Sequence, residues 1–334
     1  MTRVLINGID GLLGAKIAQL LSTDPAVSLL GLGRKAPPAP IGRAEHLVAK
    51  LSGHQLRTLL LAEEIDVVIH LDFVGAERHV TSREVALQQN ILGSMELLGA
   101  CVGAGVGRVL VRSHTAIYGA NSLNPTFIGE SRPVARSHAP GVIRDFAEVE
   151  QFLAEFGTQH PDLALVPIRC ASLIGGWSPI VDYLTQREPR TLIGFDPGMQ
   201  LLHLDDAATA FALAACAQAR GAFNVAAADT LCLSQMIKLV GKQAAPVFEP
   251  VVNLALALGQ RDVLGRWPFD LSFLRHSCVV STTKAHDELG WAPAHTAFAA
   301  LQDLNANRQA GESHEISEEA LQAFLARRSL PHER

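Results

Sequence analysis

Short apolar runs alternate with helical apolar spacing along the first half of the chain. Arg3–Asn7 is an aliphatic, β-branched run that ends at a glycine, and Ala15–Leu21 has the apolar spacing of a helix. Further strand-like runs follow, separated by helical patterns: Ser28–Leu32, Val67–Leu71, Arg108–Arg112 and Leu163–Arg169. Strands that alternate with helices connect by right-handed crossovers, so the pattern predicts an α/β fold with a doubly wound parallel sheet.

A glycine-rich turn follows the first predicted strand. Gly8–Gly14 has the spacing Gly-x-x-Gly-x-x-Gly between that strand and the first helix. In a turn of this kind the glycines allow a tight bend, close approach of a pyrophosphate and close packing of the helix on the strand. The free N–H groups of the helix N-terminus then favour an anion. The turn predicts a Rossmann-type cofactor site that includes Gly8, Asp10, Gly11, Leu12, Leu13 and Gly14; a tight turn without a ligand is the alternative.

The second predicted strand ends in Gly31–Lys35, without the acidic residue that usually binds the ribose hydroxyls. Arg34 is in a position to bind a 2′-phosphate, which would favour NADP over NAD. The alternative is that Arg34 and Lys35 belong to a solvated loop. We therefore expect NADP or NAD as the cofactor, without a choice between them.

Composition narrows the classes of partner. The chain has 334 residues, of which 48% are hydrophobic and 18% charged, with 28 Lys and Arg against 33 Asp and Glu. It is too apolar to be disordered, and its length fits one large or two modest domains. A mildly acidic chain without a basic cluster is not typical of nucleic-acid binding. Apolar runs such as Phe211–Cys216 are far shorter than the ~20 residues of a membrane span.

The five cysteines are odd in number and widely separated, and none forms a Cys-x-x-Cys pair. They are typical of reduced thiols in a cytoplasmic protein. The N-terminal residues show no basic leader or apolar export segment, which agrees with that location.

Many ordered segments resemble one family. They are the Gly8–Gly14 turn, Asp66–Leu71, Asn90 with Gly93, Ser113–Gly119, Glu130, Ala147–Glu150, Arg169, Gln200–Asp206, Phe223–Val225, Thr282–Lys284 and Leu289–Trp291. Over nearly the whole chain they resemble the extended short-chain dehydrogenase/reductases of the NAD-dependent epimerase/dehydratase group, which act largely on nucleotide sugars.

The resemblance implies a Rossmann domain of residues 1–170 plus about 201–226. It also implies a smaller mixed C-terminal domain of residues 171–200 plus 227–334 that binds a small-molecule substrate. Leu71 and Asn90 join the expected cofactor contacts. Helices near 84–105 and 141–157 would form a homodimer. A charged amphipathic helix is predicted over Ile316–Arg328.

The residues that carry proton transfer in this family are missing. Family members use a Tyr-x-x-x-Lys pair, in which the tyrosine is the acid/base and the lysine lowers its pKa. Alignment on Glu148 and Glu150 places Val142 and Phe146 at those positions. The only tyrosines, Tyr118 and Tyr183, have no lysine four residues later, and no lysine lies between Lys50 and Lys238.

A different acid/base remains as a candidate. His114 occupies the position of the family's Ser or Thr, and Asp72 follows a neighbouring predicted strand. Because both come at the carboxyl ends of strands, we expect Asp72 to orient His114 as a general acid/base, with help from Ser113 or Tyr118. The alternative is a histidine that is only hydrogen-bonded in a packed pocket.

His203, Asp205 and Asp206 lie close together, as metal ligands do. In the family this segment leads into a helix, so we interpret Asp206 as a helix N-cap and predict no metal.

Three classes of function follow. One is an NAD(P)-dependent epimerase, dehydratase or reductase with a non-standard acid/base. Another is a non-redox lyase, isomerase or cyclase that uses His114, and the last is a non-catalytic binding protein.

Overall fold

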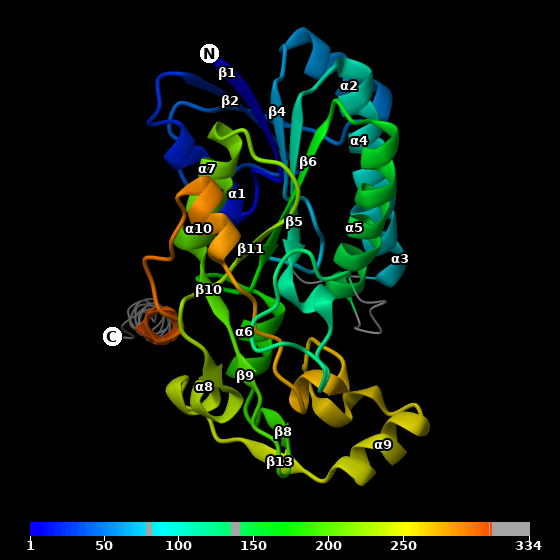
Figure 1. Ribbon diagram of the computed structural model, residues 1–334, viewed down its shortest axis with the longest axis vertical. Coiled ribbons are helices and arrows are strands. Elements are labelled where there is room, and N and C mark those ends of the chain that lie inside the picture. Colours follow the sequence, from blue (N-terminus) through cyan, green and yellow to red (C-terminus); the bar gives the residue numbers. More distant parts are fainter. Residues whose placement is uncertain (78–81, 135–140, 307, 309–334) are drawn as a thin grey trace, which may run out of the picture.

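The computed structural model describes residues 1–77, 82–134, 141–306 and 308. A sheet of seven parallel strands forms its centre, in the order β11-β6-β5-β4-β1-β2-β3 (Figure 1). The strands are β1 Thr2–Asn7, β2 Val27–Gly33, β3 Glu45–Val48, β4 Val67–His70, β5 Arg108–His114, β6 Ala164–Cys170 and β11 Phe223–Val225. Because the order grows outward from β1 on both sides, the sheet is doubly wound, and the predicted fold class is confirmed.

Helices cover both faces of the sheet (Figure 1). On one face lie α1 (Leu12–Leu21), α7 (Leu204–Cys216) and α10 (Thr283–Leu289); on the other lie α2 (Gly53–Ala62), α4 (Gly93–Ala104) and α5 (Val142–Gln159). A short helix α3 (Arg83–Leu87) and a π-helical turn (Gln88–Leu92) lead into α4. The first helix buries Leu13 and Ile17 completely, which agrees with its apolar spacing.

The predicted strands agree with the observed ones to within two residues at each end. Strand β3 was not predicted. Its four residues are all exposed at the edge of the sheet, so they show neither an apolar run nor an alternating pattern. The predicted helix over Ile316–Arg328 lies outside the described residues.

A smaller group of elements lies below the carboxyl ends of the strands (Figure 1). It contains short paired strands and helices: β7 Ser172–Ile174, α6 Pro179–Thr185, β8 Arg190–Leu192, β9 Gly198–Met199, β10 Leu201–His203, β12 Leu231–Cys232, α8 Leu233–Leu239, β13 Ala245–Val247 and α9 Glu249–Ala257. Short 3-10 turns cover Thr115–Tyr118, Arg261–Leu264 and Leu271–Leu274. The division into two domains stays a prediction.

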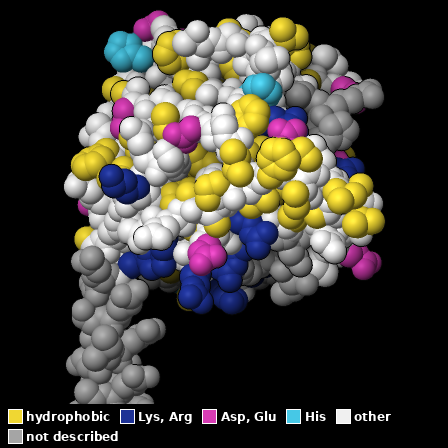
Figure 2. All heavy atoms as spheres, turned by 90° about the horizontal axis from the view of Figure 1, so that it is seen from below, with side chains coloured by type: hydrophobic (Ala, Val, Ile, Leu, Met, Phe, Trp, Pro, Cys, Tyr) yellow, Lys and Arg dark blue, Asp and Glu magenta, His cyan; other side chains and the backbone are white. Residues whose placement is uncertain are grey.

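The surface of this smaller group is partly apolar. Around α9 the side chains of Phe248, Val251, Leu254 and Leu258 are all more than half exposed. Figure 2, seen from below, shows hydrophobic side chains gathered among scattered charges on this end of the molecule. No helix in the described ranges is long and apolar enough to cross a membrane.

Candidate functional site

The glycine turn connects β1 to α1 with very little space between them. Gly8 has a φ of +100°, which side chains rarely allow, and a Cβ there would lie 2.9 Å from the Asp72 nitrogen. A Cβ on Gly14 would lie 2.4 Å from the Gly8 carbonyl oxygen. Glycine is therefore required at both positions, and the N-terminus of α1 opens directly onto a cavity.

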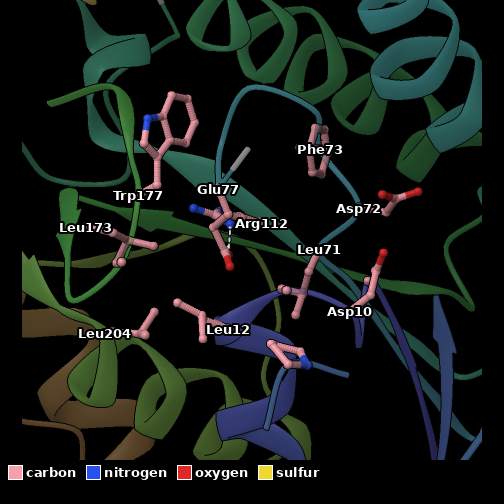
Figure 3. A pocket seen from close by; sticks show the side chains of 14 residues that line it. Asp10, Leu12, Leu71, Asp72, Phe73, Glu77, Arg112, Leu173, Trp177 and Leu204 are labelled. Atoms are coloured by element: carbon pink, nitrogen blue, oxygen red, sulfur yellow. Dashed lines mark hydrogen bonds and ion pairs between the residues drawn. The ribbon is translucent and has the colours of Figure 1, made fainter. Parts of the chain in front are cut away.

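That cavity lies at the carboxyl ends of the strands (Figure 3). It has a volume of about 160 Å³, and five residues of the predicted cofactor site line it: Gly8, Asp10, Gly11, Leu12 and Leu71. Leu13 instead buries its side chain and contributes only its backbone N–H.

An acidic side chain already lies at the end of α1. The Leu13 N–H donates to Glu77 Oε2 at 3.3 Å, and a Cβ on Gly11 would lie 2.9 Å from the same oxygen. Glu77 also forms an ion pair with Arg112, whose side chain is almost buried (Figure 3). The turn therefore binds an anion in this structure, and that anion belongs to the chain itself.

A second cavity, of about 500 Å³, lies beside the first, and Asp72 lines both. Arg34 lines the second cavity, and its guanidinium donates to Asp72 Oδ2 at 3.3 Å. Gln89 donates to Asp72 Oδ1 at 2.8 Å. The two cavities together match the size of a ligand pocket.

Asn90 does not line either of these cavities. Its Oδ1 accepts from the Val74 N–H at 2.8 Å, and its Nδ2 donates to the Val74 carbonyl and to Asp145. Asp145 is fully buried and pairs with Arg83. Asn90 thus holds the loop after β4 in place, which supports the cavity wall indirectly.

The structure does not join Asp72 to His114. Among the described residues Asp72 bonds to Arg34 and Gln89, whereas His114 Nδ1 accepts the Ala116 N–H at 2.9 Å. Since Nδ1 carries a lone pair, the proton of the neutral ring is on Nε2. The structure therefore does not show the expected Asp72–His114 pair. Asp72 instead accepts from Arg34, and His114 accepts from the Ala116 backbone N–H.

Burial, followed by the nearby charge of Arg112, lowers the pKa of His114 to about 3. The ring is neutral near pH 7, so it can donate a hydrogen bond from Nε2 but does not carry a positive charge. It lines two small cavities of about 30 and 20 Å³, each about the size of a water molecule.

Ser113 and Tyr118 belong to a buried polar network. Ser113 donates to Glu150 at 2.5 Å, and Arg169 donates to Glu150 from two nitrogens. Arg169 also donates to the Tyr118 hydroxyl, which donates to Asn224 Oδ1 at 2.8 Å. Burial raises the pKa of Tyr118 to about 12, so the phenol stays protonated. Their predicted help in catalysis stays untested, but both side chains have a structural role here.

The two positions expected for the family's tyrosine and lysine carry apolar side chains. Val142 and Phe146 are buried and line the 30 Å³ cavity next to His114. The Phe146 ring packs on Phe73 with centroids 4.7 Å apart. No proton can be exchanged at either position.

Comparison with known proteins identifies the family of this chain. The model of the NAD dependent epimerase/dehydratase family matches residues 4–226, from the first strand to β11. The chain belongs to this family. An uncharacterized protein of Mycobacterium tuberculosis is 29% identical over 314 residues, which cover 90% of this chain and 82% of that protein.

Family members of known activity are also similar. A UDP-glucose 4-epimerase of Azospirillum brasilense is 25% identical over 328 residues and covers 88% of each chain. The crystal structure of a UDP-glucose-4-epimerase from Stenotrophomonas maltophila, with bound NAD and formylated UDP-arabinopyranose, has a TM-score of 0.71 at 18% identity. It covers 94% of this chain and 100% of that one. At this identity the structural likeness concerns the fold.

Sequence reasoning missed Glu77 and Arg112 in this member of the family. Arg112 lies inside an apolar strand run, and a buried arginine needs a partner, so a signal was present. Glu77 gave none, because it follows the strand in an irregular loop. Asp206 also differs from its prediction: His203 is the N-cap of α7, and Asp206 lies in the first turn.

The Glu150 network predicts a stability effect. Glu150→Gln removes the buried charge that compensates Arg169, so we expect the free energy of unfolding to fall by about 3 kcal/mol in urea titration. Glu148→Gln, which removes an exposed pair with Arg144 on the same helix, should change it by less than about 1 kcal/mol. Equal effects of the two variants would contradict the prediction.

The lowered pKa of His114 predicts a loss of stability in acid. The unfolded chain binds a proton below about pH 6.5, whereas the folded chain resists it until about pH 3. Stability is therefore present above pH 6.5 and falls as the pH drops toward 3. His114→Gln should flatten this slope by about 1.4 kcal/mol per pH unit between pH 6 and 4. Exposed His286→Gln is the control, and an unchanged slope in His114→Gln would refute the assignment.

Proposed function

We propose that the protein binds NAD or NADP at the Gly8–Gly14 turn and acts on a small hydroxyl or carbonyl compound, such as a nucleotide sugar. The observation that carries the proposal is the anion contact at α1, where the Leu13 N–H donates to the Glu77 carboxylate. A pyrophosphate is an anion of the kind that such a helix end favours. Relatives named as UDP-glucose 4-epimerases support this class of substrate.

The residues present fit a dinucleotide if Glu77 moves. Gly11 has an extended backbone with φ of −93°, and among the described residues only Glu77 would lie within 3.4 Å of a Cβ placed there. A phosphate oxygen at the Leu13 N–H would replace Glu77 Oε2 and repel the carboxylate. Arg112, which lines the same cavity, could then pair with the phosphate.

Arg34 is the residue that would distinguish NADP from NAD. It stands at the end of β2 in the 500 Å³ cavity, where a Rossmann domain accepts the adenine ribose. Asp72 holds its guanidinium from one side. A 2′-phosphate would gain a charge-assisted contact with Arg34, which supports NADP without excluding NAD.

The proton chemistry must differ from that of the family's Tyr-x-x-x-Lys pair. When bound, a nicotinamide ring supplies hydride transfer. Of this chain's residues, His114 is a neutral donor that can stabilise developing negative charge on a substrate oxygen. Its small cavities must widen before a substrate reaches it.

The apolar replacement of the usual pair favours a second candidate. With Val142 and Phe146 where proton transfer normally takes place, the same fold would serve for a non-redox reaction at His114, or only for binding. Turnover without a change in the nicotinamide spectrum, lost in His114→Ala, would favour the non-redox reaction.

We also propose a homodimer formed by the helices near 84–105 and 141–157. The first of them leaves Leu87 and Leu92 more than one-third exposed, which supports an apolar contact. The five cysteines are free thiols, which supports a cytoplasmic location.

Titration with the four nicotinamide dinucleotides tests the main proposal. We expect NAD, NADH, NADP or NADPH to bind by calorimetry with a dissociation constant below about 1 mM, and Gly11→Trp to abolish binding because the indole fills the cavity. The backbone of Gly11 accepts a side chain, so the variant should fold, and circular dichroism checks this. Absence of binding for all four would refute the proposal.

Glu77 gives a sharper test of the same site. Because its carboxylate occupies the anion position, Glu77→Gln should strengthen dinucleotide binding by about tenfold, the effect of removing about 1.4 kcal/mol of competition. Glu63→Gln is the control and should leave binding unchanged. Glu63 forms an exposed ion pair with Arg3 near the start of β1, at the opposite end of that strand from the glycine turn. Weaker binding in Glu77→Gln would show that the carboxylate supports the site instead of competing for it.

A further inference from the structure

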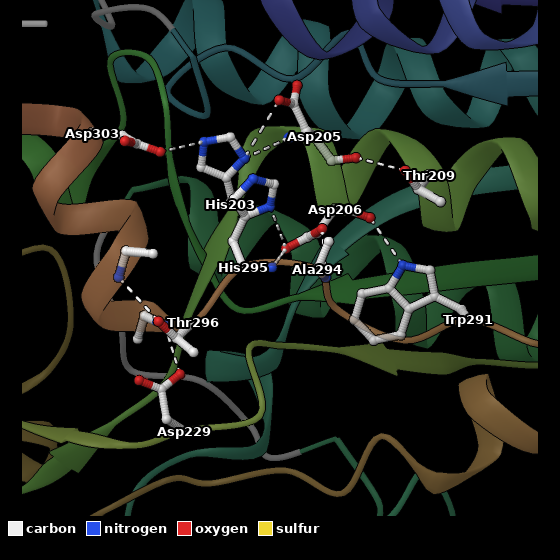
Figure 4. A network of polar contacts seen from close by, with 12 residues as sticks. His203, Asp205, Asp206, Thr209, Asp229, Trp291, Ala294, His295, Thr296 and Asp303 are labelled. Carbon is white, nitrogen blue, oxygen red and sulfur yellow. Dashed lines mark hydrogen bonds and ion pairs between the residues drawn. The ribbon is translucent and has the colours of Figure 1, made fainter.

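Two histidines from distant parts of the chain meet beside the start of α7 (Figure 4). His203 ends β10, and His295 lies in the segment before the helical residues 297–306. Their rings stack with centroids 4.1 Å apart and an angle of 28° between the planes. This cluster is separate from the residues that line the cavity at the glycine turn.

Carboxylates surround the two rings. His203 Nδ1 lies 3.7 Å from Asp205 Oδ2, and His203 Nε2 lies 3.8 Å from Asp303 Oδ2. One ligand atom from each of His203, Asp205 and His295 can be chosen so that all lie within 4.8 Å of one another. Two imidazoles and a carboxylate form a ligand set that Zn²⁺ and similar ions accept.

Asp206 holds His295 in the orientation of a ligand. Its Oδ2 accepts the His295 N–H at 3.0 Å and lies 3.2 Å from His295 Nδ1, while its Oδ1 accepts the Ala294 N–H. If Nδ1 carries the ring proton toward this carboxylate, the lone pair is on Nε2. Metal-binding histidines characteristically have a carboxylate on the other nitrogen, because it fixes the ring and its tautomer.

The charges around the two rings favour a cation. His203 Nδ1 accepts the Asp205 N–H at 3.2 Å, so an ion bound through this nitrogen would displace that hydrogen bond. Three carboxylates, from Asp205, Asp206 and Asp303, lie around the two rings. A divalent ion would neutralise part of this negative charge.

We propose that His203, Asp205 and His295 bind one divalent transition-metal ion, with Zn²⁺ as the test case and Asp303 or water completing its coordination. Metal–ligand bonds of about 2.0–2.2 Å require the three atoms to move slightly closer together. Lys16 must also release Asp205, with which it forms an ion pair. The ion would join the β10–α7 junction to the C-terminal helical residues, as a structural site.

Untagged protein freed of metal by EDTA dialysis is the material for the test. We expect calorimetric titration with ZnCl₂ to give one ion per chain, and Co²⁺ to give the visible absorption of a site with nitrogen and oxygen ligands. His203→Ala and His295→Ala should each weaken Zn²⁺ binding at least tenfold. His286→Ala is the matched control, since this exposed histidine pairs with the neighbouring Asp287.

Lys16→Gln keeps the test decisive if a histidine variant fails to fold. This variant leaves every proposed ligand in place and removes the competing ammonium group, so Zn²⁺ should bind several times more tightly. Absence of binding at 100 µM Zn²⁺ in the wild-type protein would overturn the proposal. Equal affinity in the wild type, Lys16→Gln and a folded His203→Ala variant would overturn it as well, because the ion would then lie elsewhere.

Discussion

The close contact between Gly14 and the Gly8 carbonyl determines much of this structure. Only glycine allows α1 to begin directly on the end of β1, and this places the first free N–H groups of the helix at the carboxyl edge of the sheet. Those groups need an anion or water. Glu77 supplies the anion in this structure, and Arg112, buried in β5, compensates its charge. The geometry of a dinucleotide site and a competitor for it therefore arise from one backbone constraint.

The site combines a glycine turn that opens onto a cavity with an apolar wall next to His114. The turn keeps its three glycines, and Val142 and Phe146, at the positions expected for the family's tyrosine and lysine, are both apolar. Nearby, Ser113 bonds to Glu150, and Tyr118 bonds to both Arg169 and Asn224, so these side chains connect the carboxyl ends of β5, β6 and β11. A neutral His114 lies beside this apolar wall.

In several places a carboxylate joins two distant parts of the chain by accepting hydrogen bonds from backbone N–H groups. Glu77 binds the start of α1, Asp206 binds the N–H groups of Ala294 and His295, and Asp229 binds the N–H of Ala297 at 2.6 Å. The last two tie residues 294–297 to α7 and to the segment after β11. Since such charge-assisted bonds are stronger than neutral ones, they define how the segments meet. The same arrangement brings His295 against His203.

The sequence by itself determined the doubly wound sheet, the glycine turn and the loss of the Tyr-x-x-x-Lys pair, because periodicity, glycine spacing and residue counts are local properties. It also placed Arg34 and Asp72 at the strand ends. It did not determine the partners of those side chains: Asp72 binds Arg34 and Gln89, and His114 binds a backbone N–H. Glu77 at α1 and His295 beside His203 were decided by the tertiary structure alone. These contacts depend on where irregular loops bring residues far apart in sequence, and no periodic pattern encodes that.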